Sequence, residues 1–251
     1  MTMRMSVTGI GALCLLLTSC GGLHGHPVPA TDTPGAAFPT SKAAAATPGT
    51  TLPELTAWVQ GGESVDRKGF HTVTREGATT DLGDDVAFTS PSQKIKCMTS
   101  SKMSPYAGGL SCLVQLVDPP ARPAAVPADS NWVGGWLDYP GDTLNVGAQH
   151  GDPGQFVNGY GSVLNYGNRL TFGDYDCRMD SNGLTCVDKS AGSGVRINDS
   201  GVQPVGCLQR TDPGMHGLAY ACAGSESSSP ETDSTTTTAP ATGTARPAPT
   251  R

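Results

Sequence analysis

Two aspartates separated by one residue are the first candidates for chemistry in this 251-residue sequence. Asp174 and Asp176 flank Tyr175, and on an extended strand two residues so spaced point to the same face. Paired carboxylates can act as general acid and general base in the cleavage of a sugar bond. The solvated face of an alternating strand produces the same spacing, and we favour this second interpretation.

Histidine and serine chemistry finds less support. His150 lies in a His-Gly-Asp stretch, where it could serve as a general base, but an ordinary loop histidine is the simpler explanation. The chain contains no Gly-x-Ser-x-Gly nucleophile elbow. Residues 180–183 have the types of part of a calcium loop, but the remaining ligands are missing, so we predict a hairpin turn. We therefore assign no catalytic residue, no metal site and no cofactor.

A glycine-rich segment contains the residues that we select as a ligand-binding candidate. Trp132, Trp136 and Tyr139 fall close together, and the two tryptophans share the parity of one strand face. Such a face could present aromatic rings to a glycan or a lipid. The alternative is that these rings fill the core, because large side chains are scarce in this chain.

The cysteines show the strongest internal pattern. Three stretches repeat the order of a first cysteine, a variable segment, and a glycine-leucine pair shortly before a second cysteine. In each stretch the leucine precedes the second cysteine by an even number of residues, so both point to one strand face. A hairpin with a cross-strand disulfide needs this arrangement, although the sequence leaves other connectivities open. We predict the pairs Cys97–Cys112, Cys177–Cys186 and Cys207–Cys222.

Metal and redox roles do not fit the cysteine spacing. Zinc sites use cysteines two to four residues apart, and redox dithiols use Cys-x-x-Cys; neither spacing occurs in this sequence. Structural disulfides form in oxidising compartments outside the cytoplasm, so the cysteines predict an exported chain.

One helix and many short strands would have to position these residues. Thr51 and Glu54 have capping-box spacing, and apolar residues recur at helical intervals until Gly61 and Gly62. Short apolar or alternating runs follow, separated by turn residues. We predict strands at 86–88, 113–117, 163–164, 170–175 and 195–197, with turns at 152–154, 158–159, 182–183 and 212–214. The proline-rich stretch 118–131 predicts an exposed loop.

Composition divides the chain into one folded unit and two flanks. Residues 20–50 and 225–251 are rich in Pro, Ala, Thr and Ser and poor in large apolar residues. Such segments bury too little surface to offset the entropy of ordering, so we expect a disordered tether and a disordered tail. The predicted fold class of residues 51–224 is mostly β: a small disulfide-stapled antiparallel β domain with one short N-terminal helix.

The first twenty residues predict export and a lipid anchor. Arg4 precedes an apolar run, Ile10–Leu17, which is far shorter than the roughly 20 residues that a membrane-spanning helix needs. The run ends in Leu17-Thr18-Ser19-Cys20, which resembles a bacterial lipobox. The resemblance implies removal of residues 1–19 and acylation of Cys20, with several acyl chains giving stable membrane attachment.

The charge of the chain excludes some partners. Residues 1–19 contain one basic and no acidic residue, so the mature chain has 15 basic against 22 acidic residues, a net charge of −7. With no basic stripe, nucleic-acid binding is not expected. An acidic surface is not attracted to anionic lipid headgroups either, which leaves the acyl chains at Cys20 as the membrane anchor.

Several stretches between residues 86 and 197 resemble a domain of exported actinobacterial proteins. These stretches are Val86–Cys97, which includes Ser90-Pro91-Ser92, then Leu164–Gly167, Asp176-Cys177 and Gly183–Cys186. The domain has no established activity, so the resemblance implies only an actinobacterial, mycobacterial-type lipoprotein. This chain departs from the pattern at Gln93-Lys94, where the family has Gly-Asn, and at residues 192–195. Loss of the glycine predicts an altered loop.

The sequence therefore predicts a membrane-anchored cell-envelope lipoprotein on the extracytoplasmic face, acting as a non-catalytic binding or structural module for an envelope glycan or lipid. The alternative is a glycan- or lipid-processing hydrolase that uses Asp174 with Asp176, or His150. The two hypotheses predict different positions for Asp174, Asp176 and His150 in the folded chain. Convergence of these three residues in a cleft would favour the enzyme.

Overall fold

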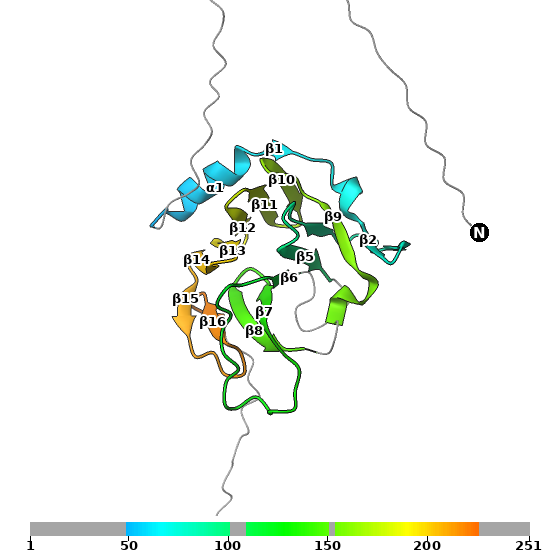
Figure 1. Cartoon of the computed structure of the whole chain (residues 1–251). Helices are drawn as coiled ribbons and strands as arrows, with labels where there is room; N and C mark the ends of the chain where they lie inside the picture. Colours follow the sequence, from blue (N-terminus) through cyan, green and yellow to red (C-terminus); the bar gives the residue numbers. More distant parts are fainter. Residues whose placement is uncertain (1–48, 101–108, 151–153, 226–251) are drawn as a thin grey trace, which may run out of the picture. The chain divides into compact units, whose positions relative to one another are not determined.

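The computed structural model describes residues 49–100, 109–150 and 154–225, which form two β-sheets, one α-helix and two short 3-10 helices (Figure 1). The fold of these residues is mostly β, as the sequence predicts. The predicted leader, Cys20 and most of both flanking segments lie outside the described residues. Asp152 and Pro153 of a predicted turn lie outside them as well.

Helix α1 (Leu52–Gln60) begins and ends where its sequence signals place it. Glu54 Oε2 accepts hydrogen bonds from the backbone N–H of Thr51 at 2.8 Å and from its hydroxyl at 2.9 Å. This interaction uses one of the amide groups that a helix start leaves without an intrahelical partner. Leu55 and Val59, one turn apart, are fully buried. The helix therefore presents a single narrow apolar edge to the sheet beneath it.

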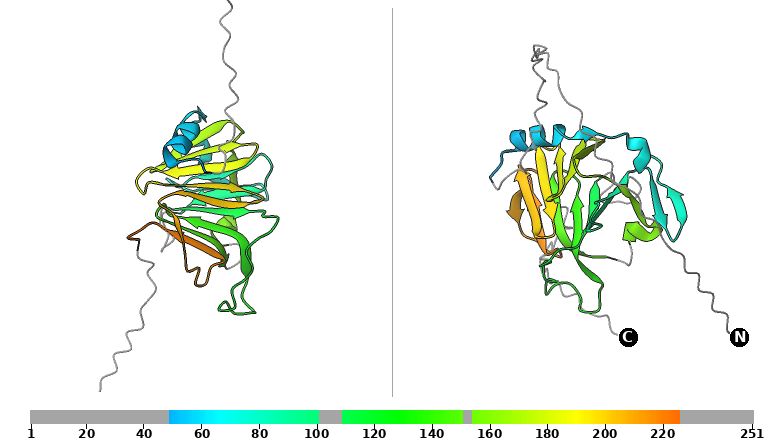
Figure 2. Two further views of the ribbon diagram at one scale, coloured as in Figure 1. Left: turned by 90° about the vertical axis from the view of Figure 1, so that its left-hand side faces the viewer. Right: turned by 45° about the horizontal axis from the view of Figure 1, so that its top comes forward.

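The smaller sheet has six strands, and β10 to β14 are consecutive antiparallel neighbours joined by short turns. β1 adds to its edge in parallel with β10. In sheet order the strands are β1 (Glu63–Ser64), β10 (Asn168–Phe172), β11 (Tyr175–Asp180), β12 (Gly183–Asp188), β13 (Ser193–Asn198) and β14 (Gly201–Gly206). Helix α1 lies across β11, β12 and β13 (Figure 2).

The larger sheet has ten strands and is antiparallel except where β4 pairs with β9. In sheet order the strands are β15 (Gln209–Thr211), β16 (Leu218–Ala221), β8 (Thr143–Gln149), β7 (Trp132–Tyr139), β6 (Leu110–Val114), β5 (Ile95–Thr99), β4 (Ala87–Thr89), β9 (Tyr160–Val163), β2 (Thr72–Arg75) and β3 (Ala78–Asp81). The 3-10 helices η1 (Arg67–Phe70) and η2 (Gly154–Asn158) precede β2 and β9. The two parallel pairings refine the antiparallel prediction.

Side chains from both sheets meet in the main hydrophobic core. The rings of Phe88 and Phe172, one from each sheet, lie 6.2 Å apart, and those of Tyr139 and Tyr175 meet edge to face at 5.6 Å. The Tyr175 hydroxyl donates to the Tyr139 carbonyl at 2.9 Å, and the Tyr139 hydroxyl lies 2.6 Å from that of Ser193. Burial raises the pKa of both tyrosines. These hydroxyls therefore act as neutral hydrogen-bonding groups that tie the two sheets together.

Each disulfide joins the two cysteines of one sequence repeat. Cys97 with Cys112, and Cys177 with Cys186, lie directly opposite each other on neighbouring strands and are fully buried. Cys207–Cys222 closes the open end of the β15–β16 hairpin. These are the pairs that the repeat predicts. In the first two repeats the even spacing of leucine and cysteine places both in the core, as strand parity requires, whereas Leu218 and Cys222 of the third repeat are partly buried against it.

The predicted strands overlap observed strands with shifted bounds, and two of the differences have an identifiable position in the fold. β6 runs from Leu110 to Val114, so the last three residues of the predicted strand 113–117 lie beyond the sheet. The predicted strand 170–175 is instead two strands, because Phe172 pairs with Tyr175 across the Gly173-Asp174 turn. Gly173 has a φ of 50°, a conformation that glycine adopts without strain.

Candidate functional site

The two aspartates considered as an acid–base pair do not share a cleft. Asp174 lies in the turn between β10 and β11 and is exposed. Asp176 is 3% exposed and accepts a hydrogen bond from the Thr171 hydroxyl at 2.6 Å. Arg169 and Lys189 each place a nitrogen 3.6 Å from its carboxylate. Asp176 is therefore part of a buried structural cluster from which Asp174 is excluded.

His150 belongs to the other sheet, directly after β8. Its ring stacks on that of Trp136 with the centroids 3.4 Å apart, and the Trp136 indole N–H donates to Asp138 at 2.9 Å. Burial lowers the pKa of His150, against the smaller opposing effect of the Asp138 carboxylate. Within the described part of the chain, no hydrogen bond or ion pair joins His150 to Asp174 or Asp176. The three residues of the hydrolase hypothesis do not converge.

Of the two alternatives for Trp132, Trp136 and Tyr139, the one in which the rings fill the core is confirmed for Trp136 and Tyr139, and the exposed aromatic platform is not formed. Trp136 is 2% exposed and Tyr139 is fully buried, and the two belong to different core clusters. The register of β7 with β8 shifts between Val133 and Leu137. Side chains of β7 on either side of this shift therefore do not follow the simple alternation between the two sheet faces that their sequence numbers predict. A β-bulge has the same effect. Only Trp132 is partly exposed.

The described residues contain neither a metal-binding cluster nor a helix that could span a membrane. No three His, Cys, Asp or Glu side chains of these ranges are grouped so that they could hold a metal ion. None of the helices found there has both the length and the apolar character to cross a bilayer.

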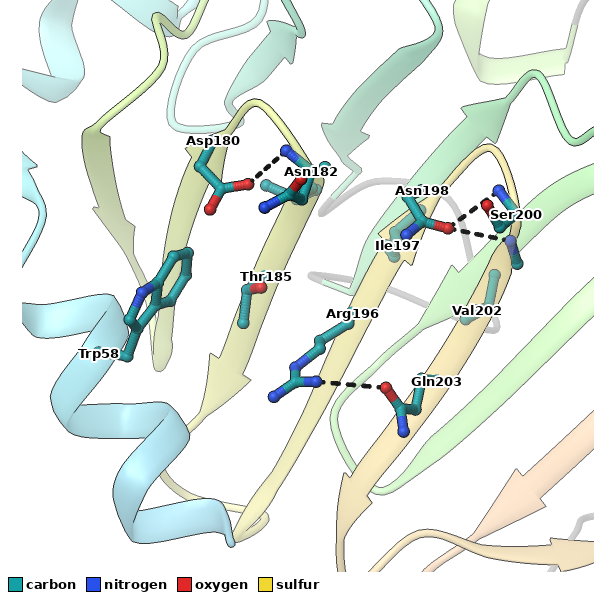
Figure 3. Close-up of a pocket in the computed structure, with 13 residues that line it drawn as sticks. Trp58, Asp180, Asn182, Thr185, Arg196, Ile197, Asn198, Ser200, Val202 and Gln203 are labelled. Carbon is teal, nitrogen blue, oxygen red and sulfur yellow. Dashed lines mark hydrogen bonds between the residues drawn. The ribbon is translucent and has the colours of Figure 1, made fainter. Parts of the chain in front are cut away.

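The candidate site is a groove of about 390 Å³ on the outer face of the six-stranded sheet, opposite the core (Figure 3). Its floor is formed by Thr185, Arg196 and Gln203, which lie in register on β12, β13 and β14. The neighbouring residues Leu184 and Ile197 point into the core. Strand alternation therefore turns this polar row outward.

Helix α1 supplies one wall of the groove through Trp58. Leu55 and Val59 pack on Val187 of β12. A side chain on Gly194 would come 3.1 Å from the Leu55 methyl group, so glycine allows the close approach of helix and sheet. Arg178 then holds the wall in place, since its guanidinium lies 4.1 Å from the Trp58 ring centroid and donates to the Trp58 carbonyl at 2.6 Å.

Two hairpin turns form the opposite rim. In the β11–β12 turn, the Asp180 carboxylate accepts from the Asn182 backbone N–H at 2.7 Å. In the β13–β14 turn, the Asn198 side chain accepts from the backbone N–H groups of Ser200 and Gly201 at 2.9 and 3.1 Å. Such side-chain-to-backbone bonds are characteristic of Asx turns. They fix the direction of the polar rim residues (Figure 3).

The groove carries both charge signs and many hydrogen-bonding groups. Arg196 donates to the Gln203 side chain at 3.3 Å, and burial lowers the pKa of its guanidinium. Asp180 contributes the opposite charge at the rim. Side-chain amides of Asn182, Asn198 and Gln203 both donate and accept. The arrangement suits an uncharged polar ligand with many hydroxyl groups.

A smaller cavity of about 120 Å³ lies beside the groove and shares Asp180, Asn182, Gly183 and Asn198 with it. Its other side is formed by the β4–β5 turn and by Tyr166. In that turn Gln93 adopts a φ of 62°, and its N–H donates to the Ser90 carbonyl at 2.9 Å.

The groove was not identified from the sequence. Its floor residues come from three separate strands and become neighbours only through strand register. Alternation of Thr185 with Leu184 and Cys186 could have shown one outward position, but not its partners. Trp58 was recognised only as part of the helical periodicity.

Comparisons with known proteins identify no relative. No protein-family model matches the chain, and neither curated protein sequences nor solved structures gave a significant match.

Proposed function

We propose that this chain is a lipid-anchored lipoprotein of actinobacterial type, and that its folded domain binds a saccharide in the groove without catalysing a reaction. The three disulfides indicate an oxidising, extracytoplasmic environment. The anchor is the sequence prediction at Cys20. The domain would thus meet its ligand in the cell envelope, outside the membrane.

The chemistry of the groove lining supports a saccharide as the ligand. Its volume of about 390 Å³ falls in the range of roughly 300–1,000 Å³ typical of small-molecule sites. Hydroxyl groups of a sugar can pair with the mixed donors and acceptors of Thr185, Asn198 and Gln203. Half-buried Trp58 adds an aromatic surface for the apolar face of a sugar ring.

The same lining argues against a lipid tail and against catalysis. An acyl chain could form no hydrogen bond with the amide and guanidinium groups that face the groove, and it would take water away from them, which is unfavourable in a covered site. Among the described residues that line the groove, Asp180 is the single carboxylate, and none is histidine or cysteine. Its carboxylate already accepts a backbone hydrogen bond. Glycosidases that cleave a sugar bond by acid–base chemistry use two carboxyl groups, one on each side of that bond.

The anchor is tested by substitution of the predicted acylation site. Cys20→Ala in the full chain should move the protein from the membrane fraction to the medium or the soluble fraction. Metabolic labelling with a fatty-acid analogue should label the original chain and not the variant. Labelling that persists in the variant, or an unlabelled original chain, would refute the anchor.

Ligand binding is tested on a printed array of linear oligosaccharides of glucose, mannose, arabinose, galactose and N-acetylglucosamine, two to eight units long. The exported chain carrying Cys20→Ala serves as the probe. Gln203→Tyr fills the groove from an exposed strand position and should abolish any signal. Thr79→Tyr, exposed on β3 of the other sheet, is the matched control. A signal that Gln203→Tyr leaves unchanged would exclude the groove as the site.

A further inference from the structure

We infer that the binding site extends from the groove across the two hairpin turns into the adjoining cavity, and that it takes a linear oligosaccharide rather than a single sugar. This inference rests on the proposed function. It adds a second subsite, centred on Tyr166, to which the groove alone gives no role.

The two cavities are separated only by the turns that they share. Asp180, Asn182, Gly183 and Asn198 line both. The rim of the groove is therefore also one wall of the smaller cavity. A chain of sugars that leaves the groove over Asn182, which is exposed, enters the smaller cavity directly.

The smaller cavity combines an exposed aromatic ring with polar groups. Tyr166 is 46% exposed, one of few large apolar side chains of the described residues that are not covered. Lys94 faces the same cavity and pairs with Asp199 at 2.7 Å, and the Ser92 hydroxyl lies 3.1 Å from that of Ser90. An aromatic ring beside fixed polar groups offers stacking and hydrogen bonds to a sugar.

Four separate sequence stretches meet at this cavity, one of them residues 198–199 of the β13–β14 turn. The β4–β5 turn at residues 90–95 comes from the ten-stranded sheet, Tyr166 precedes β10, and residues 179–183 span the β11–β12 turn. Structural turns alone would not require an exposed tyrosine at their junction. The charges of Lys94 and Asp199 neutralise each other, and the groove lining carries one charge of each sign, on Arg196 and Asp180. The extended site therefore suits an uncharged chain.

The experiment measures how affinity depends on ligand length. Isothermal titration of the Cys20→Ala chain with the glucose, mannose, arabinose, galactose and N-acetylglucosamine series, from dimer to octamer, gives Kd for each length. We expect Kd to fall at least tenfold with length in the series that binds. Tyr166→Ala should remove this gain and leave the dimer Kd unchanged, whereas Tyr166→Phe should retain it. Tyr160→Ala, on β9 and 39% exposed, is the control and should change neither value.

Each outcome separates the two proposals. Equal affinity for dimer and octamer, or a length-dependent gain that survives Tyr166→Ala, overturns the second subsite while leaving the groove intact. If Tyr166→Ala weakens the affinity for dimer and octamer by the same factor, the second subsite is also overturned, because Tyr166 would then act within the groove. Absence of binding for all five series in the original and control chains would refute the proposed function itself.

Discussion

Removal of the Leu55 side chain should undock helix α1 and thereby dismantle one wall of the groove. Leu55 is fully buried and its methyl group packs on the backbone of Gly194. Leu→Ala substitutions in protein cores cost about 2–5 kcal/mol, more where the surroundings cannot close the cavity. Because Gly194 has no side chain that could move into the space, we expect about 3–4 kcal/mol for Leu55→Ala.

The assay for Leu55→Ala combines urea unfolding with amide hydrogen exchange. A loss of about 3 kcal/mol corresponds to a Tm lower by roughly 6–12 °C in a domain of this size. A nine-residue helix is not stable alone in water, so the amides of residues 52–60 should exchange much faster. Gln60→Ala, exposed at the end of the same helix, is the control. Unchanged protection of α1 together with a loss below about 1 kcal/mol would refute this account of how the helix is held.

The remaining predictions concern the Cys177–Cys186 disulfide and the half-buried His150. The double substitution Cys177→Ala and Cys186→Ala opens a loop with a sequence separation of 9. It should lower the free energy of unfolding, measured with urea, by about 2.5 kcal/mol from loop-closure entropy alone. An unchanged free energy of unfolding would show that the bridge does not constrain the unfolded chain. Burial lowers the pKa of folded His150 below its ordinary value of 6.5, so the unfolded state binds the proton more readily, and stability should fall as pH drops below about 6.5. In His150→Gln this part of the pH dependence should disappear; an identical pH profile in the variant would contradict the assignment.

Local sequence signals predicted much of the fold because the forces behind them are local. The hydrogen bonds between Thr51 and Glu54 act within one helical turn, and the cysteine repeats follow strand parity within one hairpin. The break at Gly173 was missed because Leu170, Thr171 and Phe172 alternate apolar and polar residues as a strand does, and the aromatic Tyr175 follows three positions later. The parallel pairings of β1 with β10 and of β4 with β9 depend on segments far apart in the chain.

The candidate site was harder to predict than the fold. Trp136 and Tyr139 were chosen because aromatic rings can bind sugars or lipids. Their burial depends on how the sheet packs in the folded chain. The register shift in β7 also changes which face of the sheet each side chain occupies. Arg196 and Gln203 looked like scattered polar residues in the sequence. Their alignment with Thr185 follows from the pairing of three strands, which only the folded chain reveals.

If the protein is anchored through Cys20 and binds its ligand in the groove, as we propose, the position of α1 has a mechanical consequence. The helix is the first element of the described residues, and its edge is held by Leu55, Val59 and the contact of Trp58 with Arg178. Tension applied through Cys20 would load this helix before any strand and would peel it from one end. Release of Trp58 would open the groove while the disulfide-bonded sheets stayed folded. Pulling on the anchor would thus weaken ligand binding at forces below those that unfold the domain.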